Sequence, residues 1–258
     1  MNGRKKITWI ILVILFAGKN ILYGIMADTF DLDLYTLQVI TFGNPRNTNA
    51  DLFNLLIDLF PVFICEFLFG LTIYRHFCTG AVYYFCRQEN RFHWFASEIR
   101  NLAAVILFFS ISWFGISWIG GVLIAGKVTV TSFCLLLEAF VLFVLYLFLW
   151  SVIMNLCNIF LGSQVAGAAV FAFQIICLFS ILLVDNDGLF ALNPVANLIL
   201  SWHSLPESQA AFETGLVTNF PLWFSVLYEV LLIAVVLVIG SWMIRHMDIA
   251  LENREIQG

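Results

Sequence analysis

The stretch Phe133–Phe160, FCLLLEAFVLFVLYLFLWSVIMNLCNIF, decides the fold class of this chain. Glu138 is its only charged residue. A helix of about 20 predominantly apolar residues crosses the roughly 30 Å of hydrocarbon in a bilayer, whereas a membrane strand needs only about 9–11 residues with alternating faces. The length of the apolar run therefore predicts a transmembrane helix.

The composition of the whole chain also indicates a membrane protein. Its 258 residues are 62% hydrophobic and 11% charged, and 27 of them are phenylalanine. Soluble domains have roughly 45–50% apolar and about 25% charged residues, so a soluble fold would leave too much apolar surface in water. The apolar content excludes intrinsic disorder, and the net charge of -5 disfavours nucleic-acid binding, which needs a dense basic face.

Apolar stretches of sufficient length occur along the entire chain and predict an all-α, polytopic membrane protein with a single transmembrane domain over residues 1–258. The six predicted spans cover residues 7–26, 52–74, 102–123, 133–160, 166–184 and 222–244. We expect the first span to be retained rather than cleaved as a signal peptide, because its apolar run continues past Lys19 without an A-x-A site. An outer re-entrant or interfacial helix is predicted to begin at Pro194.

Lysine and arginine in the short loops predict the orientation of the spans. With both termini in the cytoplasm, only Arg46 and Lys127 lie on the outer side. The inner side then collects Arg4, Lys5, Lys6, Arg75, Arg87, Arg91, Arg100, Arg245 and Arg254.

Motifs for catalysis, nucleotide binding and metal binding are absent or incomplete in the sequence. The run from Gly121 to Lys127 resembles a phosphate loop, but Val128 stands where a serine or threonine must hold magnesium, and no strand precedes the first glycine. The six cysteines form no C-x-x-C pair, and the histidines show no ligand spacing. We therefore expect no catalytic residue, no metal site and no cofactor bound by this chain.

The segment between the second and third predicted spans combines aromatic and charged residues. We expect a short interfacial elbow helix, a turn near Glu89 and Asn90, and a helix start, with aromatic side chains anchored at the level of the lipid headgroups. An ordinary solvated loop that obeys the positive-inside rule explains the same residues equally well. The candidate elbow residues are Arg87, Glu89, Asn90, Arg91, His93, Trp94 and Glu98.

Ionisable residues inside the predicted spans form a second candidate site. Lys19, Asp58, Glu138 and Glu229 fall at similar depths in the outer half of the membrane at about 1.5 Å per residue. Each costs at least ~2.5 kcal/mol there unless it finds a partner or water. They are predicted to form an ion-paired layer or to line a vestibule, with simple helix association as the alternative. Glu66 lies deeper toward the inside and has no obvious partner.

Three weak motifs accompany this topology: the elbow Arg87–Trp94, the Gly162-Ser163 break before the fifth span, and Leu192-Asn193-Pro194 before the last span. Together they resemble the permease subunit of type-2 ATP-binding-cassette (ABC) exporters. The smaller bacterial members, which serve peptide, bacteriocin or drug export and self-immunity, are the most similar. The resemblance covers the whole chain through its topology. One departure is that only about six residues precede the first span, where many members have a long amphipathic helix.

The resemblance implies that a separate ATPase dimer binds ATP and magnesium and docks against the elbow, with Arg87, Glu89, Arg91 and Glu98 as candidate contacts. It also implies a second permease copy, identical or related, in a bacterial plasma membrane. The route of a peptide or other amphipathic or lipophilic substrate would lie between the two permeases, lined by the first, second and fifth spans. Membrane lipid is the remaining expected partner.

The alternative function is an autonomous secondary transporter or channel. In that case Lys19, Asp58, Glu138 and Glu229 would bind a proton or a cation. The six spans show neither inverted repeats nor paired broken helices, which disfavours this alternative. A sensor or assembly subunit without transport of its own, or a membrane enzyme with an unrecognised site, forms a third class.

Overall fold

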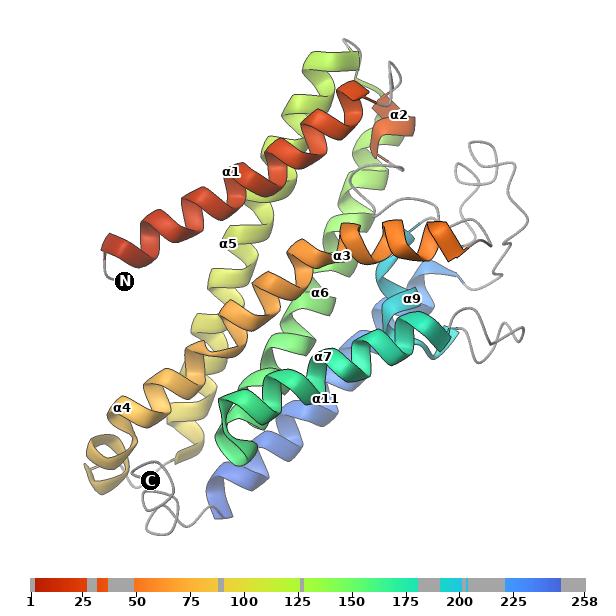
Figure 1. Cartoon of the computed structure of the whole chain (residues 1–258). Coiled ribbons are helices and arrows are strands. Elements are labelled where there is room, and N and C mark those ends of the chain that lie inside the picture. Colours follow the sequence, from red (N-terminus) through yellow and green to blue (C-terminus); the bar gives the residue numbers. More distant parts are fainter. Residues whose placement is uncertain are drawn as a thin grey trace.

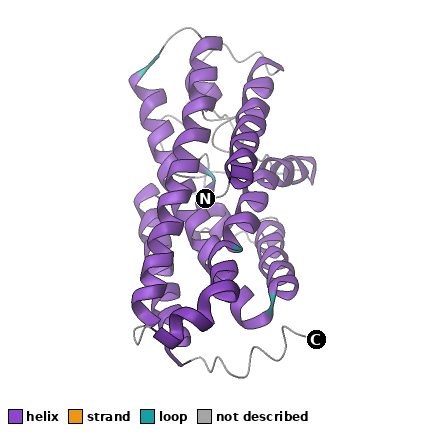
Figure 2. Ribbon diagram, turned by 90° about the vertical axis from the view of Figure 1, so that its left-hand side faces the viewer, coloured by secondary structure: helices purple, strands orange, loops and turns teal. Residues whose placement is uncertain are grey.

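The computed structural model describes residues 3–26, 32–36, 49–87, 91–125, 128–180, 191–200, 203 and 221–246. Within these ranges the structure is helical, with short loops and no strand (Figure 2). The helices are α1 (Gly3–Met26), α2 (Leu32–Tyr35), α3 (Asn49–Gly70), α4 (Thr72–Arg87), α5 (Arg91–Ala125), α6 (Val130–Leu161), α7 (Ser163–Ser180), α9 (Pro194–Leu198) and α11 (Leu222–His246).

Helix α6 occupies the centre of the bundle and packs against α3, α5, α7 and α11 (Figure 1). Helix α1 lies along α5, where Trp9 contacts Phe109 and Phe16 contacts Trp113. The rising numbers on both helices show that α1 and α5 run parallel. The start of α5 and the end of α11 lie at the same end of the bundle, where Arg91 contacts the backbone of Arg245.

Five helical stretches of the described chain are long and apolar enough to cross a membrane. They are Leu55–Thr79, Arg91–Ala125, Val130–Leu161, Ser163–Ser180 and Leu222–His246. The described apolar part of α1, Trp9–Ile25, is shorter. The prediction of an all-helical fold is therefore confirmed for the described residues, which contain five helices long and apolar enough to cross a membrane where the sequence predicted six spans.

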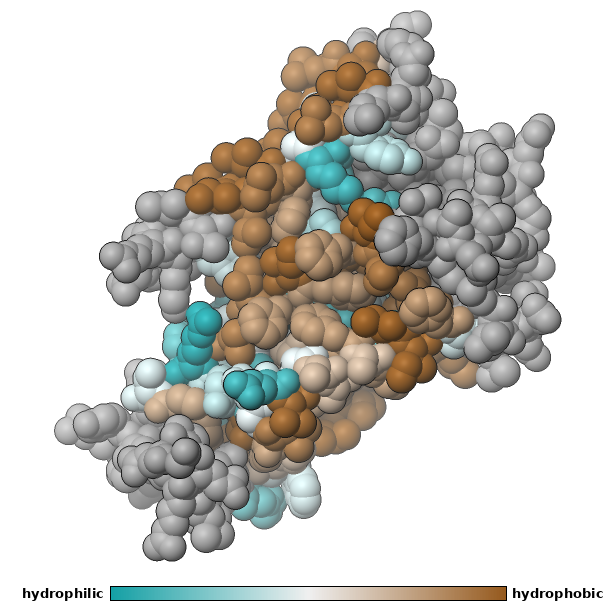
Figure 3. Space-filling model, viewed as in Figure 1, coloured by the Kyte–Doolittle hydropathy of each residue, from teal (hydrophilic) through white to brown (hydrophobic). Residues whose placement is uncertain are grey.

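On the face drawn in Figure 3, apolar residues cover most of the described surface. Helix α11 shows this most clearly, because Trp223, Val238 and Trp242 are each more than 60% exposed. Water would not tolerate so much contiguous apolar surface, whereas lipid tails are as apolar as these side chains. The bundle is thus built to face hydrocarbon.

The second predicted span differs from the structure in its course. Helix α3 ends at Gly70, Leu71 forms a turn, and α4 continues from Thr72 to Arg87. The separate short elbow helix predicted before Arg87 is therefore wrong, because Gly80–Arg87 is the end of α4. Glycine at position 80 does not interrupt the helix, and the real interruption lies nine residues earlier.

Asn155 of α6 inserts its amide into this break. The backbone N–H groups of Ile73 and Tyr74 donate to Asn155 Oδ1 at 2.8 and 3.2 Å. Asn155 Nδ2 in turn donates to the carbonyl of Phe69 at 2.9 Å. In an unbroken helix the N–H of Ile73 would bind the Phe69 carbonyl directly. The asparagine amide thus replaces a peptide group and satisfies polar atoms that lipid could not.

Asn158 completes the same junction one turn further along α6. Its Nδ2 donates to the carbonyl of Gly70 at 2.8 Å. The Cα of Gly70 lies against the side chain of Met154, so a larger residue there would force the helices apart. The break between α3 and α4 is therefore a built junction with α6.

The connection from α6 to α7 is a single residue, Gly162, with φ of 77°. L-residues with a side chain rarely adopt this left-handed backbone conformation, so glycine permits the sharp reversal. The break predicted at Gly162-Ser163 is present, since α6 ends at Leu161 and α7 begins at Ser163.

We predict that Asn155→Ala lowers the free energy of unfolding by about 2 kcal/mol, because several interhelical hydrogen bonds in lipid are lost together. Thermal unfolding of the purified protein in detergent measures the effect. The matched control is Asn101→Ala, which removes an exposed asparagine on α5. Equal melting temperatures for the two variants would contradict the role given to Asn155.

Candidate functional site

The start of α5 and the end of α11 meet at one end of the bundle, which we call the basic end after its residues Arg91, Arg100 and Arg245. Arg91 Nη1 donates to the carbonyl of Arg245 at 3.4 Å. The guanidinium of Arg245 lies 4.9 Å from the centre of the Phe92 ring, which is a cation–π distance. The two helix ends are therefore tied together.

Helices α4 and α5 also pack against each other near the basic end. His76 Nδ1 and Glu98 Oε2 are 2.9 Å apart, and the rings of Phe77 and Trp94 lie 6.2 Å apart. Trp94 is only 6% exposed. The Trp94 indole therefore fills the contact between α4 and α5. Glu98 faces α4 rather than open solvent.

The remaining candidate elbow residues are placed only in part. His93 is exposed on the first turn of α5. Arg87 is the last residue of α4 and Arg91 is the first of α5. The side chain of Arg87, together with Glu89 and Asn90, lies outside the described residues.

Lys19 and Asp58, two members of the predicted intramembrane layer, meet in the structure. Lys19 Nζ lies 2.6 Å from Asp58 Oδ1, with both side chains half-buried. Close by in sequence, Asn20 Nδ2 donates to Ser117 Oγ at 3.2 Å, and the Tyr35 hydroxyl donates to the Ser117 carbonyl at 3.0 Å. These contacts join α1, α2, α3 and α5 through polar groups.

The other two members of that layer lie on α6 and α11. Glu138 is half-buried on α6. Glu229 is fully buried on α11, and neither of its carboxylate oxygens has a hydrogen-bond partner among the described residues. The contacts of the described residues thus join Lys19 to Asp58 and not to Glu229.

Glu229 belongs to a different group, which we call the buried acid cluster: Glu66, Gln174, Tyr146 and Glu229. Gln174 Nε2 donates to Glu66 Oε2 at 2.7 Å. The hydroxyl of Tyr146 is buried and has no hydrogen-bond partner among the described residues. All four side chains are fully buried, and they come from α3, α6, α7 and α11. Two buried acids in a low-dielectric interior are costly and mark a candidate functional site.

Sequence reasoning missed Gln174 and Tyr146 and left Glu66 without a partner. The available signal was depth, since a glutamine in the middle of one apolar span can satisfy an acid in the middle of another. Depth alone leaves open which helix faces which. The partner of Glu66 therefore came only from the packing of α3 against α7.

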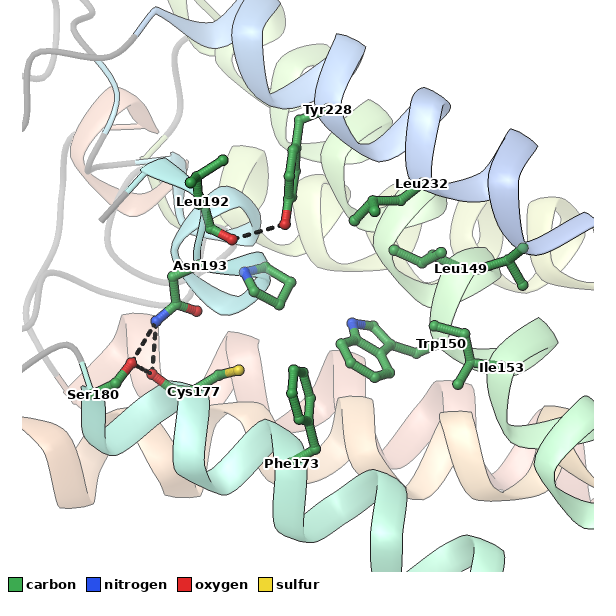
Figure 4. A pocket seen from close by; sticks show the side chains of 12 residues that line it. Leu149, Trp150, Ile153, Phe173, Cys177, Ser180, Leu192, Asn193, Tyr228 and Leu232 are labelled. Carbon is green, nitrogen blue, oxygen red and sulfur yellow. Dashed lines mark hydrogen bonds between the residues drawn. The ribbon is translucent and has the colours of Figure 1, made fainter. Parts of the chain in front are cut away.

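A cavity of about 400 Å³ opens between α6, α7, α11 and the start of α9 (Figure 4). Its walls are mostly apolar, and Trp150 and Phe173 lie on opposite helices. The indole nitrogen of Trp150 is buried without an acceptor among the described residues. The hydroxyl of Tyr228 donates to the Leu192 carbonyl at 2.7 Å on the far wall. The cavity suits an apolar group that carries one hydrogen-bond acceptor.

Asn193 forms the polar corner of this cavity. Its Oδ1 accepts from the N–H of Val195 at 2.9 Å and caps α9, which begins at Pro194 as predicted. Its Nδ2 donates to the carbonyl of Cys177 at 2.7 Å, near the end of α7. The predicted outer helix is only five residues long, and all five residues are buried, so it packs into the bundle and does not lie on a surface.

A buried hydrogen-bonded chain fixes α9 to α11. Ser225 Oγ donates to Asn197 Oδ1 at 2.5 Å and lies 2.7 Å from His203 Nε2. Burial lowers the pKa of His203 from its ordinary 6.5 to about 4, and hydrogen bonds to the carbonyls of Leu200 and Ile199 oppose this shift in part. At neutral pH the imidazole is therefore uncharged.

No group of three or more histidine, cysteine, aspartate or glutamate side chains in the described residues could hold a metal ion. The described sites offer ion pairing, apolar binding and buried carboxylates.

The fold and these sites define a helical, membrane-embedded protein whose polar groups concentrate at one end and at two places inside the bundle. The chain belongs to the family described as protein of unknown function (DUF2705), whose model matches residues 9–250. It matches no curated protein and no solved structure.

We predict that Lys19→Met lowers the free energy of unfolding by about 1 kcal/mol, because it leaves Asp58 with no cation in a half-buried position. Thermal melting in detergent measures the loss. The double variant Lys19→Asp with Asp58→Lys should recover most of it by reversing the pair. A Lys19→Met variant as stable as the wild type would show that the ion pair does not stabilise the fold.

We predict that stability falls as the pH drops through the window between 6.5 and about 4, because the folded state disfavours the charged imidazole of His203. The contribution is fully present above pH 6.5 and is lost below about 4. By linkage the loss reaches about 3 kcal/mol. Melting temperatures across this range measure it, and His203→Gln should flatten the His203 part of the profile. An unchanged profile in that variant would contradict the assignment.

Proposed function

We propose that this chain is the permease subunit of an ABC exporter and couples ATP hydrolysis by a separate ATPase to substrate movement. The observation that carries the proposal is the helical corner at the basic end. There α4 and α5 approach each other through His76–Glu98 and Phe77–Trp94, and α5 then continues unbroken for 35 residues. At about 1.5 Å per residue α5 is far longer than the roughly 30 Å hydrocarbon layer, so a push on the corner moves the whole helix.

In this proposal α1 also crosses the membrane, which brings the number of spans to six. Both termini are cytoplasmic, and the basic end faces the cytoplasm of a bacterial cell. The positive-inside rule supports that orientation. The ATPase dimer binds ATP and magnesium and contacts the corner between Arg87 and Arg91. Two permease copies, identical or related, form the complex through α1, α3 and α7.

The substrate class in the proposal is a peptide or another amphipathic or lipophilic molecule. Its support is the cavity beside Trp150, whose walls are mostly apolar. A site of about 400 Å³ suits a side chain or part of a lipophilic ligand rather than a whole peptide.

We predict that Arg87→Glu combined with Arg91→Glu lowers the amount of ATPase that co-purifies with this chain by about tenfold, because reversed charges repel a docking groove of complementary sign. Co-expression with a neighbouring ATPase gene, followed by affinity purification, measures the effect. The matched control is Arg75→Glu, an exposed reversal on α4 that lies about 18 Å from Arg87 along the helix. Undiminished ATPase in the double variant would overturn the coupling role of the corner.

A second candidate is an autonomous transporter driven by a proton or a cation. The buried acid cluster favours it, since intramembrane carboxyl groups serve as ion sites in many transporters. Ion flux in vesicles that contain this chain alone separates the two candidates. Flux that disappears in Glu229→Gln would support this second function, and ATPase-dependent transport alone would support the first.

A further inference from the structure

A groove of about 630 Å³ runs between α5 and α11 at the basic end. It lies apart from the Trp150 cavity and from the buried acid cluster. Its inner part is lined by Ala103, Leu237 and Val238. Its outer part is lined by Trp242, Arg245 and His246.

The chemistry of the groove changes along its length. Apolar side chains line the part nearer the middle of α11, and basic side chains line the part at its end. Arg100 reaches the same groove from α5. Because both helices face hydrocarbon for most of their length, the apolar part of the groove is continuous with the lipid phase. A ligand that fits must have an apolar tail and a polar end.

Within the described residues, no carboxylate neutralises the arginines of the groove. Among the described residues, neither Arg100 nor Arg245 forms an ion pair with an acid, since Glu98 pairs with His76 on the opposite side of α5. Arg245 is held in place by the Phe92 ring and by the bond from Arg91 to its carbonyl. Its guanidinium hydrogen-bond donors therefore stay available for an anion, which arginine binds through its planar fork.

We propose that this groove binds an anionic phospholipid, with its phosphate between Arg100 and Arg245 and an acyl chain along Ala103 and Leu237. Arg245 lies at the level of Phe92, and Arg100 lies eight residues, or about 12 Å, further along α5. A phosphate between them would meet Arg245 at the end of the groove and Arg100 at its side. Trp242, which is 62% exposed, stands at the junction where indole rings favour the membrane interface. A soluble anion would use only the arginines and leave the apolar channel empty.

The proposed lipid site requires only that the chain is embedded in a membrane. It therefore does not depend on the proposed coupling to an ATPase. It also leaves free the helices α1, α3 and α7, through which we propose that two permease copies meet. A lipid bound between α5 and α11 would hold these two helices together at the basic end.

The experiment compares lipid binding to the delipidated, purified full chain in mixed micelles of phosphatidylglycerol or phosphatidylcholine. Native mass spectrometry counts bound lipids, and thermal melting reports stabilisation. We expect phosphatidylglycerol to be retained in preference to phosphatidylcholine. Arg100→Gln with Arg245→Gln should weaken this binding by roughly tenfold, since the double variant removes both cations that attract the lipid phosphate. The matched control Arg75→Gln, at an exposed arginine outside the groove, should bind like the wild type.

Two further arms identify the ligand class. Ala103→Phe narrows the apolar channel and should weaken phosphatidylglycerol binding with both arginines intact. Glycerol phosphate, which has the headgroup chemistry without acyl chains, should not raise the melting temperature. If glycerol phosphate stabilises as well as phosphatidylglycerol does, the site is an anion site and the lipid assignment is overturned.

Other outcomes also decide the matter. If the wild type retains the two lipids equally, the proposal is overturned. This comparison uses no variant, so it does not depend on whether the double variant folds. If Arg75→Gln loses as much phosphatidylglycerol binding as the double variant does, binding depends on general surface charge, and the proposed site is also overturned. If the double variant changes the oligomeric state and leaves lipid binding intact, the groove is an interface between copies of the chain.

Discussion

The amide of Asn155 in the break between α3 and α4 is the contact on which the arrangement of the bundle depends. A break in a membrane helix exposes N–H and C=O groups that lipid cannot satisfy. Asn155 meets both needs, since it accepts from Ile73 and Tyr74 and donates to Phe69. The break can therefore exist only where α6 lies, and this fixes the register of α6 against the second span. Helix α6 then positions α5, α7 and α11, which all pack on it.

Asparagine has a similar role where α7 ends beside α9. Asn193 joins the end of α7 to the start of α9, and Asn197 receives the hydroxyl of Ser225 on α11. Lipid provides no hydrophobic drive for one apolar helix to choose another, so directional bonds and close packing must select the partners. A short amide side chain can donate and accept at once. It can therefore bond two backbone segments that both end inside the apolar region.

The sequence allowed prediction of most helices because length and composition suffice for that purpose. The run Phe133–Phe160 predicts a membrane-spanning helix, and the helix observed there is Val130–Leu161. The break at Leu71 was not predictable, since its stabilising amide comes from more than 80 residues away. Depth counting brought Lys19 and Asp58 to one level, where they pair. The same counting grouped Glu229 with them, because depth does not specify the face of a helix, and Glu229 is instead fully buried without a contact to Lys19 among the described residues.

Helix α5 connects the polar regions at the two ends of the bundle. Its first turn carries Arg91 and Phe92, which hold the end of α11. Its C-terminal half carries Ser117, which binds Asn20 of α1 and Tyr35 of α2. The helix between them contains no proline, and its hydrogen-bond ladder is continuous from Arg91 to Ala125. The second span differs because its hydrogen-bond ladder is interrupted at Leu71. If a partner moves the corner of α4 and α5, α5 therefore carries the motion outward to α1 and α2, while the junction at Asn155 is where α4 can bend away from α3.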